Sequence, residues 1–383
     1  MPASPSTARV INDRLALDHL QRRGPLTAGQ LKTLTGLSRP TVADLVERLQ
    51  GSGLIEVVGE TGAERRGPNA RLYGIVASLA HLAALDVRTR SVAVVVADLL
   101  GTTLAEASLP IGRDTGTEPA VERAAALLER TAREAGAARL HSVGIGAPGL
   151  IDPATGELRG TTGLPAWHGR LVGALNERLT ATVLVENETN LAAVAEQRLG
   201  AARGHDTFAF LWLGQGVGAA VVLDGKLRRG ASGGAGEIGF LPVPGTGGLP
   251  SATGCEEGFD ALVSRAALTR LAAEHGIEAP AEEAVRDAPA AGERGGAFLE
   301  ALAARIALGV ASVAAVLDPG FVVLGGETGH AGGEGLAARV EKHVAGLTPL
   351  RTRVRAGALG GGAVLSGALL TARDAAQNDL FGG

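Results

Sequence analysis

The chain has little cysteine, little lysine and few aromatic residues. Its single cysteine, Cys255, excludes an internal disulfide and a metal site made of four cysteines. Its lysines are Lys32, Lys226 and Lys342, and we attribute the excess of arginine to codon bias in the gene rather than to function. Glycine or arginine interrupts every apolar run before about 18 residues, and the N-terminus lacks an apolar signal core, so we expect no membrane segment.

The composition is that of a globular protein. Apolar residues make up 45% of the 383 residues and charged residues 20%, which argues against disorder and predicts two or three domains in the cytoplasm. The net charge of −4 excludes a uniformly basic nucleic-acid coat. Residues 1–73 nevertheless contain ten basic and seven acidic residues, a net charge of +3, so the remainder carries −7. A basic head on an acidic body indicates that the head contacts nucleic acid.

Residues 8–23, 27–36 and 38–52 each have apolar side chains at helical spacing, which predicts three helices. Thr27 is followed three residues later by a glutamine, which is the pattern of a capping box at the start of the second helix. Ser38 is a suitable cap for the third helix, whose first turn tolerates the proline that it contains.

Residues 53–58 and 70–75 predict the two strands of a β-wing, which completes a winged helix-turn-helix. Such motifs place the N-terminal half of the third helix in the major groove of DNA, and a basic wing tip suits the backbone or the minor groove. The residues that we expect to contact DNA are Thr27, Ser38, Arg39, Thr41 and Asp44 in the helical part, and Arg65 and Arg66 at the wing tip.

Other interpretations of the head stay open. Arg39 suits a guanine edge as well as a phosphate. The three helices also suit a packing module that binds no DNA, and the wing tip also suits a solvated loop.

The body has the pattern of an α/β fold, in which strands alternate with alanine-rich helices. Two strand ends are rich in glycine, at residues 214–218 and 325–326, as expected for two lobes around a cleft. Residues 214–218 equally suit a structural turn. We therefore divide the chain into a winged helix-turn-helix domain, residues 1–76, and a two-lobed body, residues 77–383.

Short phrases of the body resemble the ROK family, which comprises repressors, uncharacterised reading frames and sugar kinases with an actin-like ATPase fold. In chain order they are residues 144–149 (GIGAPG) with 151–152 (ID), 185–190 (VENETN), 236–239 (GEIG), 254–257 (GCEE), and 317–319 (LDP) with 324–326 (LGG). The resemblance extends over essentially the whole chain, because the family's repressors carry a winged head. It implies a transcriptional repressor that binds a palindromic operator in double-stranded DNA as a homo-oligomer, either a dimer or a tetramer.

The body departs from the family's kinases where they bind ATP. The kinases have an Asp-x-Gly-Gly-Thr hairpin whose glycines let the backbone approach phosphate. The matching residues 86–90 contain no glycine and include Arg88 and Arg90. The family's catalytic aspartate is Glu188 here, one methylene longer, and a misplacement of about 1 Å costs on the order of a hundredfold in rate. We expect no catalytic residue and no cofactor; the alternative is an active sugar kinase with an added DNA-binding head.

The family's zinc ligands are also missing. The positions of its histidine and three cysteines hold Phe240, Gly248, Pro250 and Cys255, so we expect no metal. The groups that remain for a sugar or sugar-phosphate effector are Asn187, Glu188, Glu237 and Glu257. The alternatives for the ligand are a different effector or no small ligand at all. The alternative for the whole protein is a scaffold that dimerises without binding DNA.

Overall fold

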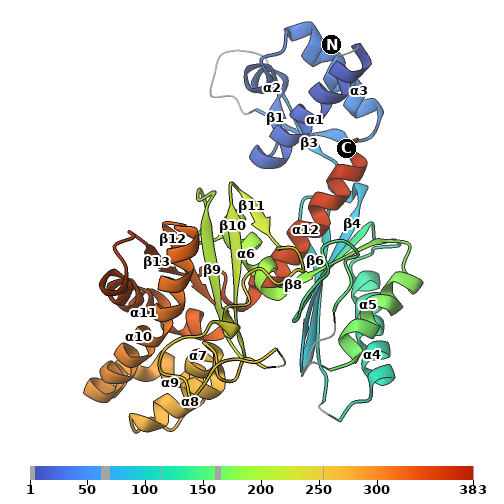
Figure 1. Ribbon diagram of the computed structural model, residues 1–383. Coiled ribbons are helices and arrows are strands. Elements are labelled where there is room, and N and C mark those ends of the chain that lie inside the picture. Colours follow the sequence, from blue (N-terminus) through green and yellow to red (C-terminus); the bar gives the residue numbers. More distant parts are fainter. Residues whose placement is uncertain (1–4, 62–69, 113, 160–164, 253, 383) are drawn as a thin grey trace.

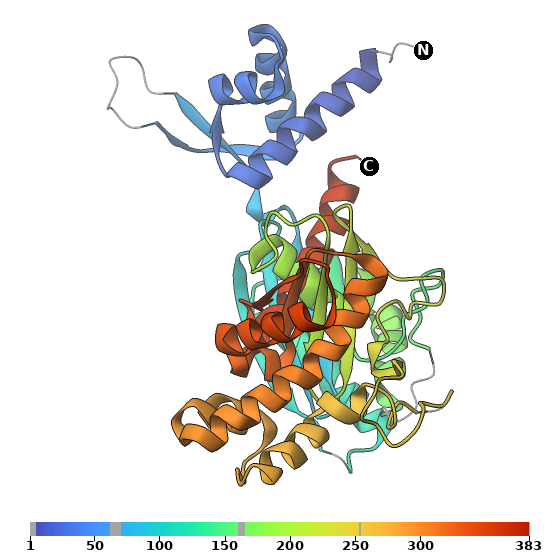
Figure 2. The same ribbon diagram turned by 60° about the vertical axis from the view of Figure 1, so that its left-hand side comes forward.

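A computed structural model of the chain describes residues 5–61, 70–112, 114–159, 165–252 and 254–382. A small head stands at one end of a larger body that contains two β-sheets (Figures 1 and 2). The expected combination of a winged helix-turn-helix with a two-lobed α/β body is confirmed.

The head contains three helices and a small sheet in the order β1-β3-β2. Its elements are α1 (Pro5–Arg23), β1 (Leu26–Thr27), α2 (Ala28–Thr35), α3 (Arg39–Gly51), β2 (Ile55–Glu60) and β3 (Arg71–Ile75).

Local side-chain chemistry fixes where the head's helices begin and end. The Thr27 hydroxyl accepts the Gln30 amide at 3.2 Å, and the Gln30 side chain accepts the Thr27 amide at 2.8 Å, which confirms the capping box. Gly36 ends α2 with a φ of 71°, a left-handed conformation that glycine adopts without strain. Ser38 caps α3 by accepting the Thr41 amide at 3.3 Å.

The first lobe of the body is a five-stranded sheet in the order β6-β5-β4-β7-β8, in which β4 pairs antiparallel with β5 and parallel with β7. Helices α4 and α5 cover one face of this sheet (Figure 1). The elements are η1 (Ala77–Leu79), β4 (His81–Arg88), β5 (Ser91–Asp98), β6 (Thr103–Pro110), α4 (Thr117–Glu134), β7 (Ser142–Ala147), α5 (Trp167–Arg178) and β8 (Thr182–Asn187).

The second lobe is a five-stranded sheet in the order β11-β10-β9-β12-β13. Its strands are β9 (Phe208–Leu213), β10 (Val217–Leu223), β11 (Lys226–Arg228), β12 (Phe321–Gly325) and β13 (Arg353–Ala356). Its helices are η2 (Ile238–Phe240), α7 (Asp260–Val263), α8 (Arg265–Glu274), α9 (Ala281–Asp287), η3 (Ala288–Ala291), α10 (Gly292–Leu317), α11 (Gly326–Leu347) and η4 (Gly360–Gly362).

Two helices, α6 (Glu188–Leu199) and α12 (Ala363–Leu380), lie between the two sheets (Figure 1). They approach closely through glycine: a Cβ on Gly367 of α12 would lie 2.0 Å from the Leu191 carbonyl oxygen of α6. Beyond the sheets, α12 continues toward the head. There Ala372, Ala376 and Phe381 are buried in the same hydrophobic cluster as residues of α1.

One helical segment, Ala281–Leu317, is long and apolar enough to cross a membrane, which the sequence alone did not predict. Half of its most apolar window is buried, and Phe298, Leu302, Ile306 and Val310 of α10 lie in the core of the second lobe. These features are typical of the core helix of a globular protein.

Candidate DNA-binding surface and inter-lobe site

Helix α3 exposes the N-terminal half that was predicted to contact DNA. Val42 and Leu45 begin a buried stripe along the helix, which fixes its rotation in the head. As a result, Ser38, Arg39 and Thr41 lie at the surface. The Ser38 and Thr41 hydroxyls lie 2.7 Å apart and can hydrogen-bond to each other, whereas no hydrogen bond or ion pair joins the Arg39 side chain to another described residue. Arg39 is thus the basic group that this surface presents.

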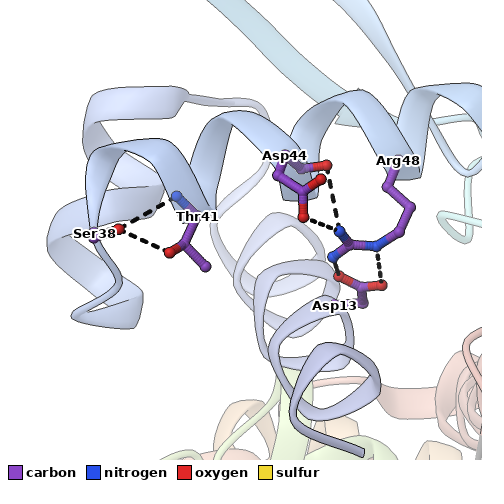
Figure 3. A network of polar contacts seen from close by, with 5 residues as sticks. All are labelled: Asp13, Ser38, Thr41, Asp44 and Arg48. Carbon is purple, nitrogen blue, oxygen red and sulfur yellow. Dashed lines mark hydrogen bonds and ion pairs between the residues drawn. The ribbon is translucent and has the colours of Figure 1, made fainter. Parts of the chain in front are cut away.

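A polar network holds α3 against α1 (Figure 3). Arg48 of α3 donates from Nε to one Asp13 oxygen at 3.0 Å and from Nη2 to the other at 2.5 Å. The hydrogen bond to Asp13 is the largest of the causes that raise the Arg48 pKa. Asp44 accepts from Arg48 Nη1 at 2.5 Å, so its carboxylate is already engaged one turn before the arginine.

Two of the predicted DNA contacts have other roles, and two cannot be placed. Thr27 is buried, and its hydroxyl caps α2, so the structure gives it a role within the head. Asp44 is exposed but paired with Arg48. Arg65 and Arg66 lie outside the described residues. The surface that the structure assembles from the prediction is therefore Ser38, Arg39 and Thr41.

In the body, a charged cluster joins the two lobes. Arg88, at the end of β4, donates from Nε to Asp86 at 2.8 Å and from Nη1 to Glu327, the second residue of α11, at 3.0 Å. Burial raises the pKa of Asp86, and Arg88 opposes that rise. Gly214 leaves room for this contact, because a Cβ there would lie 2.5 Å from Glu327 Oε2.

Glu188 belongs to the same cluster. Burial raises the pKa of its carboxyl to about 7; Asp86 and Glu327 raise it as well, whereas Arg88 lowers it. We call Asp86, Arg88, Glu188 and Glu327 the inter-lobe cluster. With three carboxyl groups around one guanidinium, this cluster favours a proton on Glu188 near neutral pH.

The other predicted ligand residues lie elsewhere or have other partners. Asn187 caps α6 by accepting the Thr189 and Asn190 amides, and its own amide donates to the Gly149 carbonyl at 2.9 Å. Glu237 and Glu257 are exposed, and no hydrogen bond or ion pair among described residues joins them to Glu188. A hollow of about 630 Å³ on the second lobe, lined in part by Leu262, Arg305 and Leu347, includes none of the predicted ligands.

The residues in the region of the family's metal site do not fit zinc. Gly248 has no side chain, and the Glu257 carboxylate fills the space beside it, only 2.3 Å from where a Cβ would stand. Phe240 is partly exposed and has no donor atom. A single thiol, Cys255, cannot supply the four nitrogen or sulfur ligands of a structural zinc site.

Two polar residues escaped the prediction, the partly buried Glu327 and the buried His168. Glu327 follows the glycine pair 325–326 that marks a strand end, and this position was the available signal. His168, at the start of α5, is 1% exposed and interacts with the backbone of Arg88. Burial lowers its pKa to about 4, so it is neutral at physiological pH.

Comparison with known proteins identifies both parts of the chain. The sequence pattern of the ROK family matches residues 82–375, which is most of the chain. The chain belongs to the ROK family. The pattern of the MarR family matches residues 12–66, the helices and first wing strand of the head. A MarR-type winged head on a ROK body is the architecture of a ROK transcriptional regulator.

The individual relatives include repressors and kinases. A xylose repressor of Caldicellulosiruptor bescii is 24% identical over 340 residues, which is 84% of either chain. A glucokinase of Halalkalibacterium halodurans is 29% identical over 208 residues, covering 50% of this chain and 63% of the glucokinase. The crystal structure of a ROK family transcriptional regulator, a homologue of the E. coli MLC protein, superimposes with a TM-score of 0.78 over 98% of both chains at 19% identity, which shows the shared fold.

Proposed function

We propose that this chain is a DNA-binding transcriptional repressor, and that its body binds a small effector without phosphorylating it. The observation that carries the proposal is the exposed N-terminal half of α3, with Arg39 free to contact a base or a phosphate. The rigid attachment of α3 to α1 through Arg48 and Asp13 supports it, because a recognition helix must enter the groove in a fixed orientation. The similarity to a xylose repressor over 84% of both chains agrees with this function.

Binding to DNA provides the direct test. Fluorescence anisotropy would compare duplex DNA from upstream of the protein's own gene with random duplex at several salt concentrations, since phosphate contacts make affinity fall with salt. If Arg39 contacts a base, Arg39→Ala weakens binding to the specific duplex by about 1–3 kcal/mol. Arg23→Ala, which removes the same charge at the end of α1, is the matched control. Equal affinity of the wild type for both duplexes at every salt concentration refutes the proposal.

For the regulatory part, we propose a dimer on an imperfect palindrome, because each chain contributes one recognition helix and two-fold symmetry in the protein matches two half-sites. We propose a sugar or sugar phosphate as effector and Glu188 as the predicted ligand residue that faces it. The relatives come from bacteria, whose DNA lies in the cytoplasm. We therefore propose that this chain works in the cytoplasm.

A sugar kinase is the second candidate, and one observation favours it. A carboxyl with a pKa of about 7 suits a general base, and Glu188 stands where the family's kinases have theirs. Against this function, the Arg88 guanidinium is bound to Asp86 and Glu327 in the hairpin that would have to admit nucleotide phosphates. We therefore propose that the body is a degenerate kinase. A coupled assay across hexoses and amino sugars decides between the two, and turnover that Glu188→Ala abolishes would reinstate the kinase.

A further inference from the structure

The Arg88 bridge links parts of the chain that belong to different lobes. Arg88 and Asp86 lie on the central strand of the first lobe, whereas Glu327 opens a helix of the second, 239 residues along the chain. The Asp86 side chain is 4% exposed, and those of Arg88 and Glu327 about one third. Partial burial reduces the screening by water and salt that weakens surface ion pairs.

Arg88 is the positive charge between carboxylates of the two lobes, so its bridge determines how closely the lobes approach each other. Without the guanidinium, the carboxylates of Asp86 and Glu327 would face each other across the lobe boundary beside Glu188. One oxygen of Asp86 and one of Glu327 already lack a partner among the described residues. Like charges in a partly buried site repel or take up a proton, and either outcome removes the ion pair, so we expect loss of Arg88 to weaken the contact between the lobes.

Strand β4 leads directly from this bridge to the head. Leu82, at its beginning, is fully buried in the hydrophobic cluster that contains Leu17 and Leu20 of α1, and Arg88 is its last residue. Arg88 lies six residue steps along the extended strand from Leu82, a span of about 20 Å. Hydrogen bonds to β5 and β7 on both sides make β4 a rigid connection.

Helix α12 provides a second connection. It packs against β4 and β7 and against α6, the helix that begins with Glu188. Its end reaches the head, where Phe381 is buried in the shared cluster and Asn378 accepts from Arg14 Nη2 at 2.7 Å. Figure 1 shows this helix extending from between the two sheets to the head.

We propose that the Arg88 bridge is an inter-lobe clasp whose opening loosens the packing of the head against the body. Strand β4 and helix α12 transmit the change, because both contact the bridge region at one end and the head at the other. A group that enters the inter-lobe cluster and displaces Glu327 from Arg88 thereby changes the freedom of the head.

Amide hydrogen exchange of the full chain tests the clasp without DNA. Arg88→Met removes the charge and keeps the side-chain length, and Glu327→Ala removes the acceptor across the lobe boundary while Asp86 and Arg88 stay paired. Arg90→Met is the matched control, since Arg90 is an exposed arginine of the same hairpin whose side chain makes no hydrogen bond or ion pair with another described residue. The amides to follow are residues 326–330 at the clasp, and 14–20 and 376–382 at the head junction.

We expect exchange to become about tenfold faster at the clasp and at the head junction in both clasp variants, and to stay unchanged in Arg90→Met. Faster exchange at the clasp alone would overturn transmission to the head, and unchanged exchange at both places would overturn the clasp. If Arg88→Met fails to fold, Glu327→Ala still tests the clasp, because it removes the contact between the lobes without removing the Arg88–Asp86 pair. DNA affinity, measured in parallel, rests on the proposed function: a wild type that binds no DNA refutes that function but leaves the exchange result interpretable.

Discussion

Glu188→Gln should stabilise the protein at alkaline pH and leave it unchanged in mild acid. Glu188 is the first residue of α6, and burial together with Asp86 and Glu327 raises its pKa from 4.5 to about 7. A partial positive charge at the N-terminus of a helix favours the ionised carboxylate, so the raised pKa means that burial and repulsion outweigh this attraction. Glutamine keeps the size of the side chain and never ionises.

The direction of this change in stability depends on whether the folded or the unfolded state holds the Glu188 proton more tightly. Below about pH 4.5 the carboxyl is protonated in the folded and unfolded states, and its ionisation costs nothing. Between about 4.5 and 7 the folded state keeps a proton that the unfolded state loses, so the free energy of unfolding falls as the pH rises. Above about pH 7 the folded state bears the full free-energy cost of ionising the Glu188 carboxyl. The difference between the two pKa values sets this cost at about 3 kcal/mol.

Urea unfolding at pH 5 and at pH 8 measures the difference. We expect Glu188→Gln to match the wild type within about 1 kcal/mol at pH 5 and to exceed it by up to about 3 kcal/mol at pH 8. Glu129→Gln, which removes an exposed carboxylate of α4 in the same lobe, should show no such pH dependence. A variant that gains nothing between pH 5 and pH 8 would contradict the proposed balance of charges in the inter-lobe cluster.

Three further predictions concern stability and composition. Thr27→Ala removes the cap of α2 and should lower the free energy of unfolding by about 1 kcal/mol, measured in urea; an unchanged midpoint would contradict the cap. Gly367→Ala forces α12 away from the Leu191 carbonyl and should cost about 1–3 kcal/mol, whereas Gly361→Ala, with open space around it, should cost much less. Elemental analysis of the untagged protein should find no zinc; near-stoichiometric zinc would mean that residues 236–257 are aligned incorrectly with the family.

Much of the head could be predicted from the sequence because its signals are local. A capping box spans three residues, and the buried stripe of α3 repeats within one helix, so neither depends on distant chain. The roles of individual side chains were less predictable. The position of Asp44 on α3 is typical of a DNA contact, but its carboxylate pairs with Arg48, one helical turn further along. Arg48 in turn binds Asp13 of another helix. Only tertiary packing brings these three residues together.

The body shows the same division between local and distant signals. The strands next to glycine-rich phrases were predicted, whereas β6, α5, α11 and α12 were not. The three helices among them begin without a side-chain cap, so their sequences carry no clear start signal. The clasp could not be predicted at all. Nothing near Arg88 in the sequence indicates Glu327, and only the closure of the two lobes makes them partners.

Asn187 and Glu188 are adjacent, and both were predicted to bind the effector, but the structure gives them separate roles. A strand ends and a helix begins between them, so Asn187 is the cap and Glu188 the first helical residue. The cap uses the Asn187 carbonyl oxygen for two backbone amides and its amide for Gly149, which leaves little for a ligand. The same bonds fix the start of α6 and hold Glu188 beside Asp86 and Arg88. Asn187 therefore acts on the inter-lobe cluster as a positioning residue, and its replacement by alanine should shift the pKa of Glu188 as well as destabilise α6.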